Sequence, residues 1–433
     1  MALSNSVKTW VIDPTLNNSS RCEFRLTDGV LASNFKLIDV GVYSTNIVDR
    51  STGVFYPSIL GVLASIKKLS LFSGSTMIDE IQELPAYGSI QHLRVSNQAQ
   101  EDLNRFELLN GFSFTNSAND ASVADNDEVG ALTTEATHKD YVKSYLENPT
   151  NSFKQYHNNQ IQIANNEREG ASGMLVLSNY LEFLRSVPVL PNLPDLRLII
   201  EWNLTASDYY VDSDAPSAVT PSFNPIRPQL IYEEILGVPA QNGLVKLPYM
   251  CAIVERFVVP TASDGNTVTS SFRSGAFRNR FLKDLVLFNK VQTDESWLRK
   301  KERSVAQKGE KIQLVVNSRK FLPDQGCNQE AMKLQYFNDA IGGLNVPLAS
   351  AMSSFQDAVG GTCRTLDTQT KVVAHNFSVF GVMVNEAIDR LDLEYTRTGS
   401  TVSADQTASF ELLAFGRVNR LLEMQNGQIR LSY

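Results

Sequence analysis

The side chains that most often do chemistry are few in this 433-residue chain, and they lie far apart along it. Its four histidines are His92, His138, His157 and His375. No two of them are four residues apart, the spacing with which one face of a helix holds a metal ion. Its four cysteines are Cys22, Cys251, Cys327 and Cys363, and no two form a C-x-x-C pair. We therefore predict reduced, mostly buried thiols, with no metal site and no disulfide framework.

The sequence motifs of common catalytic sites are absent as well. The chain has no G-x-x-x-x-G-K-[ST] phosphate loop, no G-x-G-x-x-G after a strand, no G-x-S-x-G elbow and no H-E-x-x-H pair. Each of these patterns positions a phosphate cradle, a nucleophile or a metal-bound water. We predict that the protein is not an enzyme, with no catalytic residue, no cofactor and no metal ligand.

One acidic segment, Asp125 to Gly130, has alternate carboxylates of the kind that can converge on a calcium ion. However, Val129 stands where a ligand is needed, and Glu135 comes one residue too early to close the site. We interpret the segment as a solvated acidic loop.

A basic region runs from Arg273 to Lys311 and holds eleven Lys or Arg residues against five Asp or Glu residues. Its local charge of +6 contrasts with the net charge of -8 of the whole chain. It predicts either a solvated charged helix or a patch that meets an acidic neighbour, a lipid headgroup surface or packaged nucleic acid.

The composition, with 42% hydrophobic and 20% charged residues, predicts a folded globular protein of two or three domains, or one very large domain. The net charge of -8 argues against non-specific nucleic-acid binding as the main task. The start of the sequence does not resemble a signal peptide, and the apolar stretch Ser58 to Ile66 is too short to span a membrane. We therefore expect a soluble protein that stays inside the cell that makes it.

Strands of period two dominate both halves of the chain. Apolar residues alternate in five clear segments: Cys22 to Leu26, Leu196 to Trp202, Ile312 to Val316, Leu391 to Tyr395 and Ile429 to Tyr433. This alternation is typical of half-buried antiparallel strands. The segments Phe35 to Tyr43 and Phe377 to Val384 are apolar on both faces or change phase, as central or bulged strands do.

Helices are predicted as short insertions between the strands. Thr76 with Asp79 predicts a capped helix that Pro85 ends, and Asn179 with Glu182 predicts another that ends at Pro188. Further helices are expected at 90–109, 294–307 and 329–341. Asn110 to Thr137 is predicted to be a long polar loop, and the four prolines between Ala206 and Pro228 predict a linker between domains.

Two colinear matches indicate an internal repeat. Lys67-x-Leu69-x-Leu71-Phe72 recurs as Lys283-x-Leu285-x-Leu287-Phe288, and Leu198-x-Ile200-Glu201-Trp202 recurs as Leu391-x-Leu393-Glu394-Tyr395. Because they flank the Pro-rich midpoint in the same order, they predict two copies of one β domain.

Three segments resemble the double jelly-roll major capsid proteins of polinton-like viruses and virophages. They are Leu69 to Ile81, Leu177 to Pro191 followed by the strand Leu196 to Leu204, and Phe415 to Leu422 with Asn426 to Tyr433. The resemblance covers most of the chain in order, but it consists of hydrophobic patterns rather than a chemical signature.

This resemblance implies an all-β fold of two jelly-roll β-sandwiches in tandem with short helical insertions. The expected division is a first jelly roll at 1–206, a Pro-rich linker at 207–228 and a second jelly roll at 229–433. It also implies a viral structural protein that self-assembles as trimeric, pseudo-hexagonal capsomers of an icosahedral shell, within a virion assembled inside the host cell. Expected partners are the chain itself as a homotrimer, neighbouring capsomers, penton or minor capsid proteins, and an internal membrane or genome through the basic region 273–311.

Two other classes stay open. A carbohydrate- or receptor-binding β-sandwich protein would hold a sugar or calcium in loops that carry Tyr209, Tyr210 and the acidic segments. A β-sandwich hydrolase would assemble paired carboxylates in a cleft by its fold. A vertex or minor shell protein is a further alternative within capsids.

Overall fold

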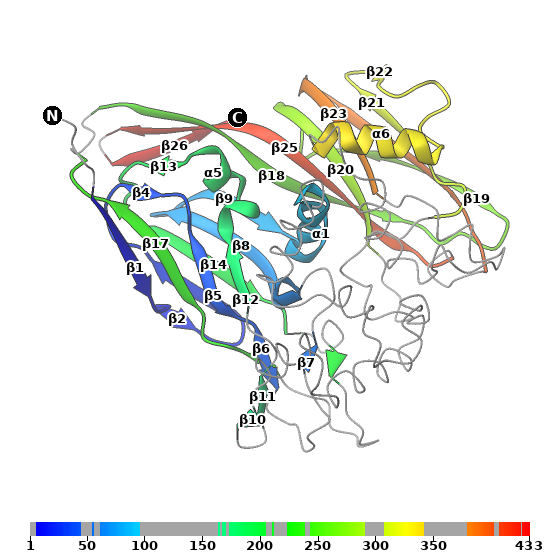
Figure 1. The fold of residues 1–433 in the computed structure, drawn as a ribbon. Coiled ribbons are helices and arrows are strands. Elements are labelled where there is room, and N and C mark those ends of the chain that lie inside the picture. Colours follow the sequence, from blue (N-terminus) through cyan, green and yellow to red (C-terminus); the bar gives the residue numbers. More distant parts are fainter. Residues whose placement is uncertain are drawn as a thin grey trace.

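The computed structural model describes thirteen stretches of the chain: residues 6–44, 54–55, 61–95, 163–164, 167–169, 173–204, 210–211, 223–238, 243–290, 307–341, 379–401, 407–425 and 427–433. Their ordered elements form two β-sandwiches joined side by side (Figure 1). Among the described residues, no helix combines the length and the apolar content that crossing a membrane requires.

The first sandwich consists of two antiparallel sheets with a permuted strand order. One sheet runs β1 (Val7–Ile12), β17 (Gln229–Ile235), β5 (Lys36–Val40) and β12 (Gly173–Val176). The other runs β3 (Arg21–Arg25), β14 (Leu196–Trp202), β8 (Ile66–Ser73) and β9 (Thr76–Gln82). Numbered in chain order, these strands give the orders 1-8-3-6 and 2-7-4-5, in which the first and last strands pair. This is the jelly-roll arrangement.

The second sandwich repeats the same permutation. Its first sheet runs β18 (Val245–Val259), β25 (Phe410–Gln425), β20 (Arg280–Lys290) and β23 (Val379–Ile388). Its second sheet runs β19 (Thr267–Arg273), β24 (Leu391–Thr398), β21 (Lys311–Val316) and β22 (Arg319–Lys320). The predicted all-β class with two jelly rolls in tandem is confirmed.

Short elements complete the fold. The added strands are β2 (Leu16–Asn17), β4 (Leu31–Ala32), β6 (Val42–Ser44), β7 (Val54–Phe55), β10 (Ile163–Ala164), β11 (Glu167–Glu169), β13 (Val189–Leu190), β15 (Tyr210–Val211), β16 (Phe223–Pro225) and β26 (Gln428–Ser432). The helices are η1 (Gly61–Ser65), α1 (Leu84–Val95), η3 (Leu177–Asn179), α5 (Glu182–Ser186) and α6 (Glu330–Ile341). The helices predicted near residues 179–187 and 329–341 are therefore present.

In four of the five alternating segments the apolar residues form the cores as predicted. In the fifth, Ile429 and Leu431 are only partly buried and Tyr433 is exposed. In the second sandwich, β24 and β21 pair so that Leu393 lies opposite Leu314, and both side chains are buried. In the first sandwich, Cys22 and Phe24 of β3 are buried while their neighbours Arg21 and Glu23 form an ion pair at the surface. The period of two thus places apolar side chains inward and charges outward.

The predicted helix at Thr76 is wrong, because this segment is the strand β9. Gly74, with φ of 55°, turns the chain directly after β8, and β9 then pairs antiparallel with β8. The helix α1 begins afterwards at Leu84, with Pro85 in its first turn. A proline is well tolerated there because the first helical N–H groups have no intrahelical partner.

Only one of the two repeat matches joins equivalent strands. Leu198 of β14 and Leu391 of β24 each lie in the seventh strand of their sandwich, as predicted. Leu69 lies in β8, the fourth strand of the first sandwich, whereas Leu285 lies in β20, the third strand of the second. That match was wrong, since apolar alternation recurs in any strand with one buried face.

The strand β17 belongs to the first sandwich, although it follows the Pro-rich segment. It pairs with β1 through Leu230 to Ile235 and with β5 through Gln229 to Ile231. A division at 207–228 would therefore separate β17 from its own sheet.

The strands β18 and β25, with 15 and 16 residues, are the longest among the described residues, and they pair along fifteen positions. In Figure 1 they run from the first sandwich into the second as one continuous ribbon. The two sandwiches meet along this ribbon.

Candidate functional site

The junction between the sandwiches forms where the ribbon crosses β9, the edge strand of the first sandwich. The backbone carbonyl of Ile78 on that edge accepts two side-chain hydrogen bonds from the second half. Tyr249 Oη of β18 donates at 2.7 Å, and Arg420 Nη1 of β25 donates at 2.9 Å. Unpaired edge groups are the usual weak point of a sheet. Here the second half of the chain satisfies one of them.

The short helix α5 fills the space beneath the ribbon. The ring of Phe183 meets the ring of Tyr249 edge-on, with 4.7 Å between the ring centroids. Ser186 Oγ accepts a long hydrogen bond from the backbone N–H of Met250 at 3.4 Å. Burial raises the pKa of Tyr249, so its hydroxyl stays a neutral donor.

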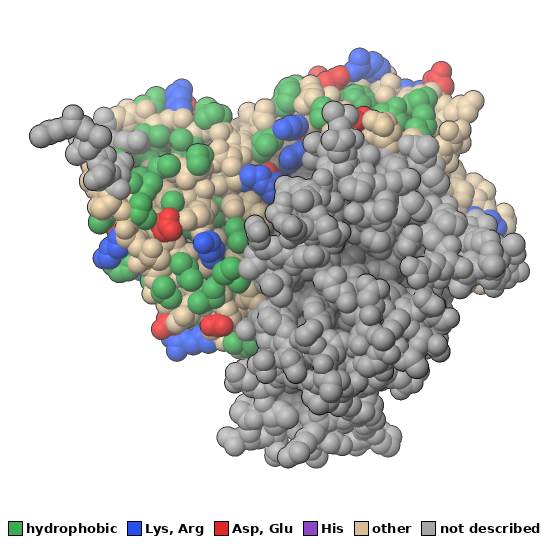
Figure 2. All heavy atoms as spheres, viewed as in Figure 1, with side chains coloured by type: hydrophobic (Ala, Val, Ile, Leu, Met, Phe, Trp, Pro, Cys, Tyr) green, Lys and Arg blue, Asp and Glu red, His purple; other side chains and the backbone are tan. Residues whose placement is uncertain are grey.

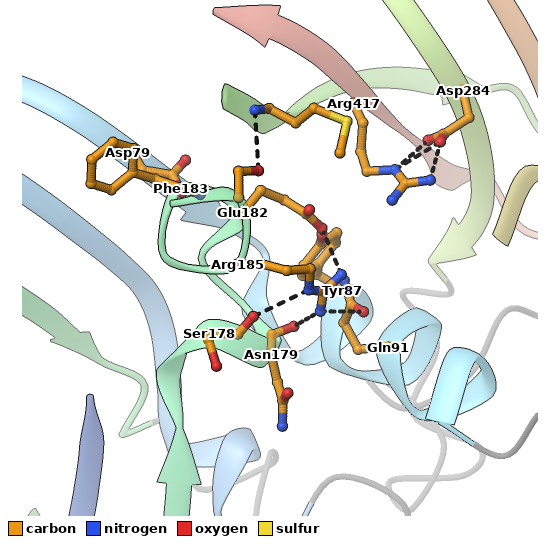
Figure 3. Close-up of polar contacts among 12 residues, drawn as sticks. Asp79, Tyr87, Gln91, Ser178, Asn179, Glu182, Phe183, Arg185, Asp284 and Arg417 are labelled. Atoms are coloured by element: carbon orange, nitrogen blue, oxygen red, sulfur yellow. Dashed lines mark hydrogen bonds and ion pairs between the residues drawn. The ribbon is translucent and has the colours of Figure 1, made fainter. Parts of the chain in front are cut away.

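Asp79 anchors α5 to β9 from inside the junction (Figure 3). Its Oδ2 accepts the backbone N–H of Phe183 at 2.8 Å, and its Oδ1 accepts the backbone N–H of Glu80 at 3.0 Å. The side chain is buried, and this burial raises the pKa of Asp79 to about 7 against the lowering effect of the Phe183 N–H. Glu182 nearby raises it further. The group therefore titrates near neutral pH.

Glu182 connects α5 to α1. Its Oε1 accepts a hydrogen bond from Tyr87 Oη at 2.6 Å and forms an ion pair with Arg185 Nη1 at 3.1 Å. Arg185 also donates to Gln91 Oε1 at 3.2 Å and to the backbone oxygen of Asn179 at 2.8 Å (Figure 3). The buried carboxylate is thus paired and hydrogen-bonded, as a buried charge must be.

Ion pairs extend the junction beyond its apolar part. Glu83, between β9 and α1, binds Arg256 at 2.8 Å and Lys290 at 2.9 Å, and both cations come from the second sandwich. Lys290 also lies 3.4 Å from Glu411. Arg417 of β25 donates hydrogen bonds from Nε and Nη2 to the carboxylate of Asp284 in β20. The two pairs of Glu83 cross between the sandwiches and fix one against the other, whereas Lys290 with Glu411 and Arg417 with Asp284 join β20 to β25 within the second. Figure 2 shows Lys and Arg side chains between the two sandwiches on the visible face.

The second sandwich holds a separate polar cluster in its own interior. Glu310 binds Lys333 of α6 at 2.7 Å, accepts Asn289 of β20 at 2.8 Å, and accepts the hydroxyl of Tyr395 of β24. Burial and the neighbouring Glu310 carboxylate raise the pKa of Tyr395 well above its usual range. The cluster therefore ties both sheets and α6 together.

The carboxylates of these sites are engaged in structural contacts. Asp79 accepts two backbone N–H groups, and Glu182 is almost fully buried at 1% exposure with Tyr87 and Arg185 on one oxygen. A glycosidase needs two carboxylates that face a substrate across an open cleft. The arrangement serves to hold elements together, and it lacks the geometry that the hydrolase interpretation requires.

Several sequence predictions concern residues outside the described stretches. They are Cys363, His138, His157, His375, the acidic segment 125–130, the loop 110–137 and residues 294–306 of the predicted helix 294–307. Cys22, Cys251 and Cys327 are free and buried, as predicted. Among the described residues, no group of three His, Cys, Asp or Glu side chains is placed to hold a metal ion.

The basic region is distributed over several elements. Arg273 ends β19 and pairs with Asp392 at 3.1 Å, and Lys290 ends β20 in the junction. These cations are used within the chain itself. The region as a whole does not form one continuous helix, since much of it is the strand β20.

The three segments that carried the family resemblance meet at the junction. Asp79, Glu182 and Arg417 each come from a different one of them. Sequence reasoning recorded the segments but missed the contacts, because Ile78 and Arg420 are separated by 342 residues. The sequence around Asp79, Thr76 to Gln82, is itself half polar, so nothing in it marked Asp79 as a buried group.

Known structures resemble this chain over its full length. A chain of the Sputnik virophage has a TM-score of 0.59 at 13% identity, covering 100% of this chain and 89% of that chain. The mavirus major capsid protein has a TM-score of 0.53 at 10% identity, covering 99% and 90%. A chain of the PBCV-1 virus capsid has a TM-score of 0.51 at 10% identity, covering 100% and 98%.

Sequence comparison contributes nothing further, because no protein-family model and no curated protein matches the chain. At such low identity the likeness concerns the fold. The chain therefore shares the double jelly-roll fold of these viral structures from end to end.

Proposed function

We propose that this protein is a viral structural protein, a major capsid protein whose copies assemble into an icosahedral shell. The observation that carries the proposal is the tandem jelly roll itself, with one strand permutation used twice and full-length similarity to capsid structures. The role needs stiff sheets and broad contact surfaces rather than a reactive cleft.

The junction supports this role physically. A shell subunit must keep its shape under contact with several neighbours, and here the shared ribbon, the edge contacts of Ile78 and the ion pairs of Glu83 hold both sandwiches in one position. Three such chains present six sandwiches around a threefold axis. That geometry gives the pseudo-hexagonal trimer that we propose as the capsomer.

We also propose a revised domain division. The first jelly roll runs through β17 to Ile235, and the second begins with β18 at Val245, because β17 pairs in the first sandwich. The link between the two jelly rolls then lies after Ile235, and the Pro-rich segment 207–228 is a connection within the first.

The proposed partners are further copies of the chain in the trimer, neighbouring capsomers, and penton or minor capsid proteins. An internal membrane or the genome is a proposed partner of the basic region 273–311. The proposed location is the capsid of a virion assembled inside the host cell.

The molar mass of the purified protein in solution tests the proposal. Light scattering coupled to size exclusion should give a stable species near three times 48.1 kDa. A monomer at all concentrations would contradict the capsomer. A monomer whose melting temperature rises with added glycan or calcium would instead favour the carbohydrate-binding alternative.

A further inference from the structure

A cavity of about 220 Å³ lies between β9 of the first sandwich and a notch in the sheet of the second. The notch follows from strand pairing along β25, which pairs with β20 up to Val418 and with β26 from Leu421 onward. Arg420 lies in this interval, Arg280 begins β20, and Tyr433 follows β26. All three side chains line the cavity.

Two guanidinium groups share one aromatic ring at this notch. The Cζ atom of Arg280 lies 3.9 Å from the centroid of the Tyr433 ring, and that of Arg420 lies 4.7 Å from it. Stacking uses the flat face of a guanidinium and leaves the N–H groups in its plane free to donate. The ring therefore holds two cations close together, although they repel each other.

These cations have no carboxylate partner within the described part of the chain. Arg420 uses Nη1 for the Ile78 carbonyl, and its Nε is buried without a hydrogen-bond partner among the described residues. Among the described residues, the guanidinium group of Arg280 contacts the aromatic ring of Tyr433. A buried donor without a partner is unfavourable, so the Arg420 side chain favours a ligand that supplies hydrogen-bond acceptors.

The acidic groups that line the same cavity are already engaged. Asp79 accepts two backbone N–H groups, as described above. Glu80 forms an ion pair with Lys68 at 3.0 Å and accepts Gln82 Nε2 at 2.6 Å. Burial also raises the pKa of Asp79 to about 7, so its carboxyl group is mainly neutral below that pH, and the charge of Glu80 is offset by Lys68. Below pH 7 the excess charge that faces the cavity is therefore that of the two arginines.

We propose that this cavity binds a phosphate-type oxyanion between the two sandwiches. The in-plane N–H groups of Arg280 and Arg420 donate to its oxygens, and Tyr433 holds both side chains in place. Guanidinium groups match phosphate oxygens in both charge and geometry. Free phosphate and a phospholipid headgroup carry the same chemistry. The site does not depend on the proposed capsid role.

Thermal unfolding of the full chain tests the site with inorganic phosphate as the probe. Phosphate at saturating concentration should raise the melting temperature by about 2 °C or more beyond sodium chloride of equal ionic strength. Arg280→Gln should abolish this difference, and its loss of one stacking contact leaves the fold intact. Arg278→Gln is the matched control, because Arg278 is exposed, carries the same charge and does not line the cavity.

Flotation with vesicles distinguishes the two sources of phosphate. Binding to vesicles that contain phosphatidic acid but not to pure phosphatidylcholine, lost in Arg280→Gln and kept in Arg278→Gln, assigns the site to a lipid headgroup. A phosphate-specific thermal shift without flotation assigns it to a free phosphate. Equal shifts in phosphate and chloride without flotation, or an unchanged response of Arg280→Gln, would overturn the proposal.

Discussion

The two sandwiches have the same strand order but place their buried charges differently. In the first, the buried carboxylates Asp79 and Glu182 lie at the junction, where their hydrogen-bond partners come from the first sandwich and the charge of Arg420 from the second half acts on Asp79. In the second, Glu310 and Lys333 lie inside the sandwich and connect its own sheets to α6. A shared topology therefore does not require a shared core chemistry. The first sandwich keeps its buried carboxylates at the boundary with the second, whereas the ion pair of Glu310 with Lys333 forms an internal clamp of the second.

Breaking the internal clamp should have the largest effect. Lys333→Met leaves the Glu310 carboxylate buried without its cation, which should lower the free energy of unfolding by about 3–5 kcal/mol. Urea unfolding monitored by tryptophan fluorescence measures the change. Lys320→Met is the control, because Lys320 is exposed and pairs with the exposed Asp324, so its loss should cost within about 0.5 kcal/mol. Equal effects of the two changes would show that the clamp is not important for stability.

Matched cavities in the two sandwiches test how tightly they are coupled. Leu198→Ala and Leu393→Ala remove buried side chains from the seventh strand of each sandwich, and each should cost about 2–5 kcal/mol. Because the ribbon joins both sandwiches, we expect either change to lower the temperature of one common calorimetric transition. If calorimetry shows two transitions, and each variant lowers the midpoint temperature of only one of them, the sandwiches unfold independently. Leu244→Ala, at an exposed position, is the control.

The junction should respond to pH through Asp79. Its pKa is raised to about 7 in the folded chain from 3.8 in the unfolded chain, so folding binds a proton in this interval. The resulting stability is fully present below pH 4 and is lost as the pH rises to about 7. Asp79→Asn should remove about 2–4 kcal/mol of this pH dependence. Urea midpoints from pH 4 to pH 8 measure it, and parallel profiles for both proteins would contradict the assignment.

The sequence predicted those features that depend on near neighbours. Cys22 with Phe24, and Leu391 through Tyr395, alternate because one face of each strand is buried, and this pattern is visible without any partner strand. Thr76 to Asp79 imitates a helix cap, but the turn at Gly74 and the pairing with β8 decide for a strand. Tertiary pairing overrides a local signal there.

The junction could not be predicted in the same way. Its contacts join Ile78 to Arg420 and Glu83 to Lys290, pairs that are distant in sequence and have no regular spacing. Likewise, β17 follows a Pro-rich segment that indicates a boundary, yet its register with β1 places it in the first sandwich. Such pairings depend on the whole topology rather than on local residue types.

The ribbon of β18 and β25 also constrains the order in which the protein can fold during synthesis. Every strand of the first sandwich precedes β18, so that sandwich can close early. β18 must then wait for β25, and joining Val259 to Phe410 closes a loop of roughly 150 residues, which costs entropy and time. Until then its fifteen residues present an unpaired edge to other nascent chains. When unfinished chains are crowded on one messenger RNA, β18 of one chain can therefore pair with a strand of another before its own β25 is made.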